Sequence, residues 1–332
     1  MNGFKWILIL SAAMGFAARA EIVLMASSGQ NGAVAIQSAI QQLFRERKSI
    51  ETVKLVGEFS ITESVVLPSW TRLDLEEARL TLADGVKAPM IISGDAEEGA
   101  HHVEITGGIL DGNRQGQGAG DFHGILFMRV EQVRISDLEV RNCSGDGIRL
   151  NGRGRHTRDV QLRNLRLMNN ARCGLNVMWA MRNVFVSDVI AGGNTEVGVR
   201  SDHSEGLFQN ICANANVGDG IFIRNIFGGT YNNLTASRNG GIGIHVLGMV
   251  CSRGSNWGAH NNSMKQSGEF SDIFFDADSR LSYGISKMTV LSNIIAGPYN
   301  EYGPAFEKSA VEFGAGVREG LQISNLMELS SE

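Results

Sequence analysis

A run of ionisable residues in the middle of the sequence has the composition of a catalytic site. The ten residues GVRSDHSEGL, at positions 198–207, contain Arg200, Asp202, His203 and Glu205. A guanidinium can bind a carboxylate, a histidine can exchange a proton near neutral pH, and two carboxylates can share acid and nucleophile roles. The same residues could equally form the polar end of a strand and its turn. The choice depends on the elements that position them.

A repeat of about 23 residues organises the surrounding chain. It consists of a glycine followed by a branched aliphatic residue, at Gly124-Ile125, Gly147-Ile148, Gly174-Leu175, Gly198-Val199, Gly220-Ile221 and Gly243-Ile244. Between these pairs, apolar and polar residues alternate with the period of a β-strand, as in 133–140 and 160–167. Several short strands in each repeat predict a solenoid whose successive coils hydrogen-bond to one another. We therefore expect an all-β fold, a parallel β-helix.

An asparagine precedes the repeating glycine by four residues in four successive repeats. These residues are Asn170, Asn194, Asn216 and Asn239. Side-chain amides both donate and accept hydrogen bonds, so identical residues stacked in a turn can bond along the solenoid. We expect these asparagines to form such a ladder.

The repeats resemble the pectate-lyase-like, right-handed β-helix superfamily over about 34–327. The stretch ITGGILDGNRQGQ, at 105–117, is similar to the Gly-x-x-Asp-Gly-Asn segment of polygalacturonase-like and alginate-epimerase-like chains. The resemblance implies an N-terminal capping helix, and AVAIQSAIQQLFRE at 33–46 has the apolar stripe of one. The catalytic motifs of polygalacturonases and the Asp-Pro-His-Glu motif of alginate epimerases are not matched. The resemblance thus predicts the scaffold rather than the chemistry.

The chain is interpreted as a signal peptide followed by one domain. Residues 1–20 combine a lysine, an apolar run and Ala-Arg-Ala before Glu21, as in secretory signal peptides. Residues 21–332 show no linker composition, so we expect a single β-helix domain, secreted or periplasmic and not bound to a membrane. The register breaks within 249–283, which predicts an irregular insertion or long loops. In an exported chain, the four cysteines permit disulfides.

Composition limits the class of partner. A net charge of −5 and a pI near 5.9 argue against nucleic acid as the main partner. The cysteines form no CxxC pair and no acidic cluster suits calcium, so neither a metal nor a cofactor is expected. The sequence leaves the oligomeric state open, including a homo-oligomer.

Strand alternation predicts which side chains leave the solenoid after each repeating glycine. One outward row is Leu126, Arg149, Asn176, Arg200, Phe222 and His245; the other is Met128, Asn151, Met178, Asp202, Arg224 and Leu247. Arg200, Asp202 and Arg224 should form one compact patch, since neighbouring coils lie about 4.8 Å apart. His203 and Glu205 should follow at the turn.

This face predicts an enzyme acting on an acidic polysaccharide, by β-elimination or a related uronate reaction. Arg200 and Arg224 would neutralise the sugar carboxylate, Asp202 would orient them, and His245 or His203 would take the proton. Substrate would also contact the rest of the face, which comprises Arg149, Asn176, Met178, Trp179 and Phe222. Two alternatives stay open: glycoside hydrolysis or glycosyl or fructosyl transfer by Asp202 and Glu205, and a non-catalytic glycan-binding β-helix.

Overall fold

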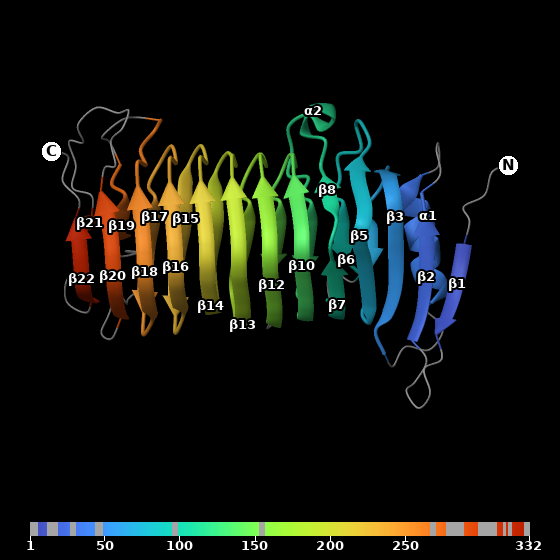
Figure 1. The fold of residues 1–332 in the computed structure, drawn as a ribbon, viewed down its shortest axis with the longest axis horizontal. Helices are drawn as coiled ribbons and strands as arrows, with labels where there is room; N and C mark the ends of the chain where they lie inside the picture. Colours follow the sequence, from blue (N-terminus) through green and yellow to red (C-terminus); the bar gives the residue numbers. More distant parts are fainter. Residues whose placement is uncertain are drawn as a thin grey trace.

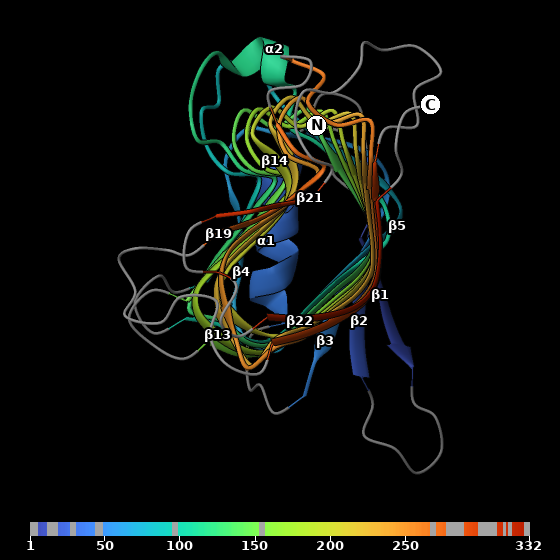
Figure 2. The ribbon, with the colours of Figure 1, turned by 90° about the vertical axis from the view of Figure 1, so that its left-hand side faces the viewer.

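The computed structural model describes residues 6–11, 19–26, 31–43, 49–94, 99–152, 157–265, 270–276, 289–297, 311–314, 317 and 321–328. The strands wind as successive coils along one axis, and the two termini lie at opposite ends (Figure 1). Viewed along this axis, the coils superimpose around one interior (Figure 2). Neighbouring coils pair in parallel, so the predicted parallel β-helix is confirmed.

The strands form two hydrogen-bonded stacks. The first comprises β1 (Trp6–Ser11), β2 (Arg19–Met25), β3 (Glu51–Ile61), β5 (Thr71–Leu82), β7 (His101–Thr106), β8 (Ile109–Asp111), β10 (Glu131–Arg141), β12 (Thr157–Met168), β16 (Thr230–Ser237), β18 (Arg253–His260), β20 (Thr289–Gly297) and β22 (Leu321–Glu328). The second comprises β4 (Val65–Leu67), β6 (Ile91–Ser93), β9 (Ile125–Met128), β11 (Ile148–Asn151), β15 (Asp219–Phe227), β17 (Ile244–Val250), β19 (Ile273–Asp276) and β21 (Val311–Phe313). The long strands β13 (Leu175–Gly192) and β14 (Val197–Asn214) turn a corner and contribute to both.

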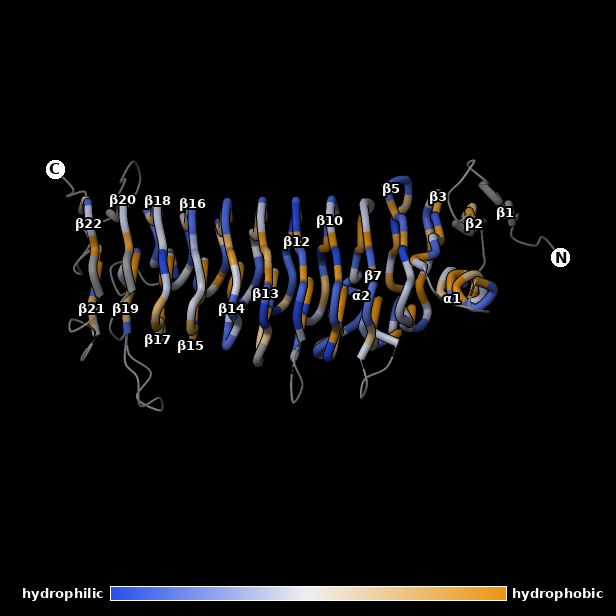
Figure 3. Tube along the Cα trace, turned by 90° about the horizontal axis from the view of Figure 1, so that it is seen from below, coloured by the Kyte–Doolittle hydropathy of each residue, from blue (hydrophilic) through white to orange (hydrophobic). Residues whose placement is uncertain are grey.

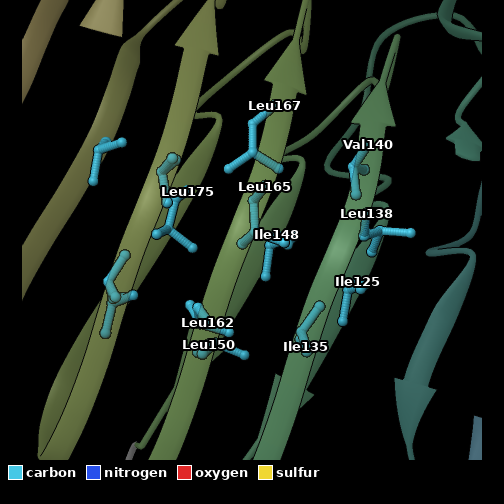
Figure 4. Close-up of a cluster of buried hydrophobic side chains, with 14 of the residues drawn as sticks. Ile125, Ile135, Leu138, Val140, Ile148, Leu150, Leu162, Leu165, Leu167 and Leu175 are labelled. Carbon is cyan, nitrogen blue, oxygen red and sulfur yellow. The ribbon is translucent and has the colours of Figure 1, made fainter. Parts of the chain in front are cut away.

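Rows of stacked aliphatic side chains fill the interior. Ile125, Ile148 and Leu175 follow one another on β9, β11 and β13, and Ile135 and Leu162 face them from β10 and β12 (Figure 4). All five are at most 1% exposed. Hydrophilic and hydrophobic residues alternate along the strands (Figure 3). This alternation gives each coil one apolar inner face, which it buries against its neighbours.

The predicted asparagine ladder is present inside the turns that precede the second stack. Asn170 Nδ2 donates to Asn194 Oδ1 at 3.0 Å, and the same bond links Asn194 to Asn216 and Asn216 to Asn239. Asn262, which was not predicted, extends the ladder and donates to Asp272 Oδ1 at 2.7 Å. Each amide also bonds to backbone groups of neighbouring turns. These buried polar groups are therefore satisfied and hold successive coils in register.

Helix α1 (Gly32–Gln42) covers most of the stretch predicted as a capping helix. Asn31 caps it by accepting a hydrogen bond from Ala33 N, and Ile36, Ala39 and Ile40 are buried in the core cluster. Residues 44–46 of the predicted helix lie outside the described residues, and its capping role stays a prediction. Upstream, β1 pairs antiparallel with β2. Export through a signal peptide at 1–20 likewise stays a prediction.

Within 249–283, strands β18 and β19 continue the solenoid where we expected irregular structure. Strand β18 pairs in parallel with β16 and β20, and β19 with β17 and β21. Trp257 fills the interior of the β18 coil and donates to Tyr231 O, while a Cβ at Gly254 would lie 2.6 Å from the Trp257 ring. In this coil, one large and several small residues take the place of the usual alternating aliphatic residues. The coil could therefore not be recognised from the sequence pattern. Residues 266–269 and 277–283 of this stretch lie outside the described residues.

Candidate functional site

The candidate site lies on the outward face of the second stack. Strand pairing places both predicted outward rows in register across β9, β11, β13, β14, β15 and β17, so their geometry is confirmed. The first row continues beyond His245 to Phe274 on β19 and Glu312 on β21. The sequence analysis did not predict these two members, because the glycine repeat cannot be recognised in that part of the chain. Side chains on adjacent coils are thereby held about 4.8 Å apart.

Asp202 is the centre of the polar contacts on this face. Its Oδ2 accepts a hydrogen bond from Arg200 Nη2 at 2.8 Å and lies 3.6 Å from Arg224 Nη1. Its Oδ1 lies 2.6 Å from His203 Nδ1. The expected patch of Arg200, Asp202 and Arg224 is therefore formed, and His203 joins it. We call these four residues the Asp202 patch.

The side chains of the Asp202 patch are more buried than their outward position on the strands predicts. The side chain of Asp202 is 3% exposed, and those of Arg200 and Arg224 are 23% and 19% exposed. Asn176 is also buried, at 3%. The neighbouring arginine, histidine and methionine side chains are long enough to cover a short carboxylate on the same face. The charges thus interact at lower effective dielectric than an exposed ion pair would.

A sharp corner places an aromatic surface beside the patch. Trp179 and His203 both adopt left-handed backbone conformations, with φ of 66° and 51°. Their rings stack in parallel, with centroids 5.3 Å apart and 8° between the planes, and Trp179 is 47% exposed. A left-handed conformation is costly for a bulky residue and occurs often at functional sites. The exposed Trp179 face, held by this corner, could stack on a sugar ring.

His245 occupies a different environment from His203. Its ring lies between Phe222 and Phe274, with centroid distances of 4.8 and 5.4 Å, and its Nδ1 is 3.2 Å from Asp219 Oδ2. Its Nε2 is buried and has no hydrogen-bond partner. Phe222 also supports the guanidinium of Arg200, whose Cζ lies 5.3 Å from the ring centroid. His245 therefore contributes to a packed aromatic row rather than to the contacts of Asp202.

A second buried carboxylate, Asp146, organises the other end of the face. It is fully buried, accepts hydrogen bonds from Cys173 N and Asn176 Nδ2, and lies 3.6 Å from Arg149 Nη1. His123 Nδ1 accepts a hydrogen bond from Asp146 N, and burial holds the pKa of this histidine below its usual range. Asp146 was not among the candidate site residues of the sequence analysis. Its position just before a repeating glycine was the only signal of this role.

Glu205 lies beyond the corner that His203 makes in β14. It lines a cavity of about 310 Å³ together with Trp179, His203 and Phe227. It also lines a neighbouring cavity of about 430 Å³ on the same side of the corner. Asp202 lies before this corner, and both of its carboxylate oxygens already have partners. The geometry thus gives the two carboxylates different surroundings.

The described residues contain no group of three His, Cys, Asp or Glu side chains that could hold a metal ion. Within the same part of the chain, no helix has the length and apolar composition needed to cross a membrane. All four cysteines carry free thiols, and no disulfide joins them. Burial raises the pKa of the Cys143 thiol, which keeps this residue un-ionised.

Comparison with known families agrees with this architecture. A family model described as "right handed beta helix region" matches residues 123–296, which is just over half of the chain. The chain belongs to this right-handed β-helix family. The expected superfamily resemblance and the right-handed fold are thereby confirmed. No curated protein matches the sequence.

Solved structures show the same β-helix fold at low sequence identity. The A-module of a mannuronan C-5 epimerase from Azotobacter vinelandii has a TM-score of 0.64 and 17% identity, covering 91% of this chain and 94% of its own. A tailspike protein of E. coli bacteriophage HK620, solved in complex with a hexasaccharide, has a TM-score of 0.58 and 14% identity. That match covers 90% of this chain and 54% of the tailspike. At these identities the likeness concerns the fold alone.

Three polar atoms on the outward row of this β-helix are buried without a partner. They are Asn176 Oδ1, Arg200 Nε and His245 Nε2. All three belong to the row that runs from β13 through β14 to β17. A buried donor or acceptor without a partner is destabilising, and such groups in native proteins call for an explanation. Two of these groups, on Asn176 and Arg200, belong to side chains that bind the buried carboxylates of Asp146 and Asp202.

Proposed function

We propose that this β-helix protein is a carbohydrate-active enzyme that binds an acidic polysaccharide at the Asp202 patch and abstracts a proton from a uronate residue. The supporting observation is that one buried carboxylate contacts two guanidinium groups and one imidazole. Two arginines against one aspartate leave a local excess of positive charge. An excess of this sign in a site of low dielectric favours a sugar carboxylate.

The chemistry that follows is proton abstraction at C5 of the sugar. Arg200 and Arg224 neutralise the substrate carboxylate, which lowers the cost of the carbanion that forms beside it. In elimination, the C5–H electrons form the C4–C5 double bond, the C4–O bond breaks, and the leaving oxygen takes a proton. Return of a proton to the opposite face of C5 would instead give epimerisation. Both reactions need the same base and the same charge stabilisation.

His203 is the better base of the two histidines that the sequence offered. Asp202 Oδ1 binds its Nδ1 and so orients the ring with Nε2 directed away from the carboxylate. The ring is partly exposed, with 36% of its side chain accessible. The Nε2 atom of His245, in contrast, is buried beneath its aromatic neighbours. We therefore assign proton abstraction to His203 and a packing role to His245.

The remaining residues of the face would hold the polymer. Trp179 offers an exposed ring for stacking on a sugar, and the Phe222 ring packs against the guanidinium of Arg200. Arg149 and Asn176, both anchored by Asp146, provide further polar contacts along the same row. Met178 pairs with Asp202 on the adjacent coil and shields it. This arrangement favours a polymer that lies across several coils.

Glycosidic hydrolysis or transfer by Asp202 and Glu205 is less well supported. A carboxylic acid that protonates a leaving oxygen must be free to hold a proton. Both oxygens of Asp202 are already held by Arg200, Arg224 and His203, so neither is free to reach a glycosidic oxygen. The corner at His203 also places Asp202 and Glu205 on different faces of the coil. We retain this mechanism, and a purely glycan-binding protein, as outcomes that the experiment distinguishes.

A panel of acidic and neutral polymers tests the proposal. We expect the full chain to raise absorbance at 235 nm with polymannuronate or polygalacturonate, or to incorporate deuterium at C5 in D₂O, but to do neither with dextran. Arg200→Lys should lose this activity, because a point charge cannot replace a bidentate fork. New reducing ends without unsaturated product or C5 exchange would indicate hydrolysis. Binding without any reaction would indicate a glycan-binding protein.

The proposed substrate is consistent with action outside the cytoplasm. The Azotobacter module named above belongs to a mannuronan C-5 epimerase, and the HK620 tailspike was solved in complex with a hexasaccharide. The signal-peptide pattern at 1–20 likewise favours a secreted or periplasmic enzyme. We propose this location together with the function.

A further inference from the structure

A third cavity, away from the Asp202 patch, is lined in part by the short helix α2 (Arg114–Gln117). Its volume is about 660 Å³. It is lined by Arg79, Thr81, Asp111, Asn113, Arg114, Gln115, Asn142 and Asn169. Two arginines and four side-chain amides thus surround one space, an unusual concentration of hydrogen-bond donors.

The floor of this cavity is fixed by Asp111, which is 6% exposed. Its Oδ2 accepts hydrogen bonds from Arg79 at 2.9 Å and from Arg141 at 3.0 Å. Its Oδ1 accepts from Asn113 N and from Asn142 Nδ2. The pKa of Asp111 lies below its usual range. Burial by itself would raise this pKa, but the hydrogen bonds and the nearby arginine outweigh the effect of burial. The carboxylate therefore stays ionised and keeps the surrounding donors in place.

The wall of the cavity is also held in position. Gln117 Nε2 donates to Ala83 O at 2.7 Å, and its Oε1 accepts from Lys87 N at 3.1 Å. On the far side, Arg114 Nη1 reaches Thr195 Oγ1 at 3.4 Å, although 81 positions separate the two residues. Helix α2 stands above the turns beside β8 and β10 (Figure 1), and its Arg114 side chain extends to the turn before β14. A groove with fixed walls loses little conformational entropy when it binds a ligand.

The charges of the groove favour an anion. Among the lining residues, two arginines stand against one carboxylate, Asp111. Just outside the lining, Glu139 binds Arg141, and Asp84 accepts a hydrogen bond from Asn113 Nδ2. The guanidinium of Arg114, in contrast, contacts a neutral hydroxyl, and 39% of the Arg79 side chain is accessible. Amides on either side can bind sugar hydroxyls. This combination suits a carboxylated sugar better than a neutral one.

We infer that this groove, the α2 groove, is a second, non-catalytic subsite for an acidic glycan, and that it binds a part of the polymer distant from the Asp202 patch. The inference rests on the proposed function for the nature of the polymer. The segment 112–124, which carries α2, also contains His123 at the Asp146 end of the candidate site. This segment therefore links the α2 groove to the Asp146 end of the outward face, along which a long chain could reach the Asp202 patch.

Calorimetric titration of the full chain with long polymannuronate tests the subsite. We expect Arg114→Gln and Arg79→Gln each to weaken affinity about tenfold, which corresponds to about 1.4 kcal/mol. Turnover of short oligomers, too short to reach α2, should be unchanged. Arg163→Gln, which removes an exposed arginine from the opposite part of the first stack, is the matched control and should bind as the parent does. Parental affinity in both groove variants would overturn the inference.

Hydrogen–deuterium exchange distinguishes failure of the α2 groove as a subsite from failure of the proposed function. With polymannuronate bound, we expect protection at 112–117 and at 198–205. Protection at 198–205 alone would overturn the subsite and leave the function standing. Protection at 112–117 alone would keep an anionic-glycan site in the α2 groove and overturn the role of the Asp202 patch. Protection of neither segment would overturn both.

Discussion

At the scale of single residues, Asp202 connects the charged groups of the site. It is buried, and its two oxygens contact Arg200, Arg224 and His203. Sequence alternation correctly put it beside the arginines on an outward face, where exposed ion pairs usually contribute little to stability. Burial changes this expectation, because removal of one partner leaves the other charges uncompensated in a dry environment.

Asp202→Ala should therefore lower both activity and stability. We expect activity on an acidic polysaccharide to fall about 100-fold or more, since two arginines and the base lose their orientation. The free energy of unfolding should fall by about 2–4 kcal/mol, as for other broken buried ion pairs. Urea unfolding and initial rates measure the two effects. Glu205→Ala, beyond the corner, is the control for stability; a fully active, equally stable Asp202→Ala would show that the patch is only a polar surface.

The two histidines give a second test at this scale. His203→Gln should reduce turnover about 100-fold or more while leaving affinity for the polymer nearly unchanged, because a general base acts in the transition state. His245→Gln should retain most of the turnover, since the His245 ring serves packing. Steady-state kinetics of both variants, with kcat and KM separated, decides the assignment. The reverse pattern would transfer the base to His245.

At the scale of the elements, ladders of like side chains determine how the coils stack. The asparagine ladder is buried and ends on the carboxylate of Asp272. An outer asparagine ladder, which includes Asn210 and Asn233, makes similar bonds at exposed positions within β14 and β16. The two ladders share their chemistry and differ in burial. Burial should therefore decide how much each contributes.

Asn239→Leu should destabilise the protein much more than Asn233→Leu. Asn239 bonds to Asn216, Asn262 and the backbone of Ala213, and its loss leaves several buried groups without partners. We expect a loss of about 3 kcal/mol for Asn239→Leu and less than about 1 kcal/mol for Asn233→Leu. Chemical denaturation checks the difference. Equal values would mean that the inner ladder adds no more than the outer one.

The direction in which a strand side chain points can be tested within β13. Val186 is 1% exposed, whereas its neighbour Ser187 faces outward and is partly exposed. Val186→Asp places an unpaired carboxylate in the core and should cost several kcal/mol, about 4 or more. Ser187→Asp should remain within about 0.5 kcal/mol of the parent. Thermal unfolding of the pair is the measurement, and similar melting temperatures would contradict the assignment.

At the scale of the whole molecule, the β-helix presents a long face on which distant parts of the sequence meet. The outward row runs from Leu126 to Glu312, and α2 projects beside its N-terminal half. A polymer has many repeating units, and a solenoid offers equally spaced positions for them. The scaffold therefore suits an extended ligand more than a compact one.

Export is the prediction that concerns the whole chain. Cleavage after Ala20 should give a mature N-terminus at Glu21. This product would lack β1 but keep most of β2, which pairs in parallel with β3. Intact-mass measurement of the protein from its native host checks the prediction. A chain that begins at Met1 would contradict export and with it the argument for an extracellular polymer.

The fold and the rows of side chains followed from the sequence, because both depend on local periodicity. Alternation along a strand and a glycine-marked repeat fix which residues stack, so Arg200, Asp202 and Arg224 could be brought together without coordinates. Only the tertiary structure could decide burial, since this depends on the size of side chains on neighbouring coils. The same holds for the buried Asp146, the preference for His203, and the α2 groove, which requires contact between residues as distant as Arg114 and Thr195.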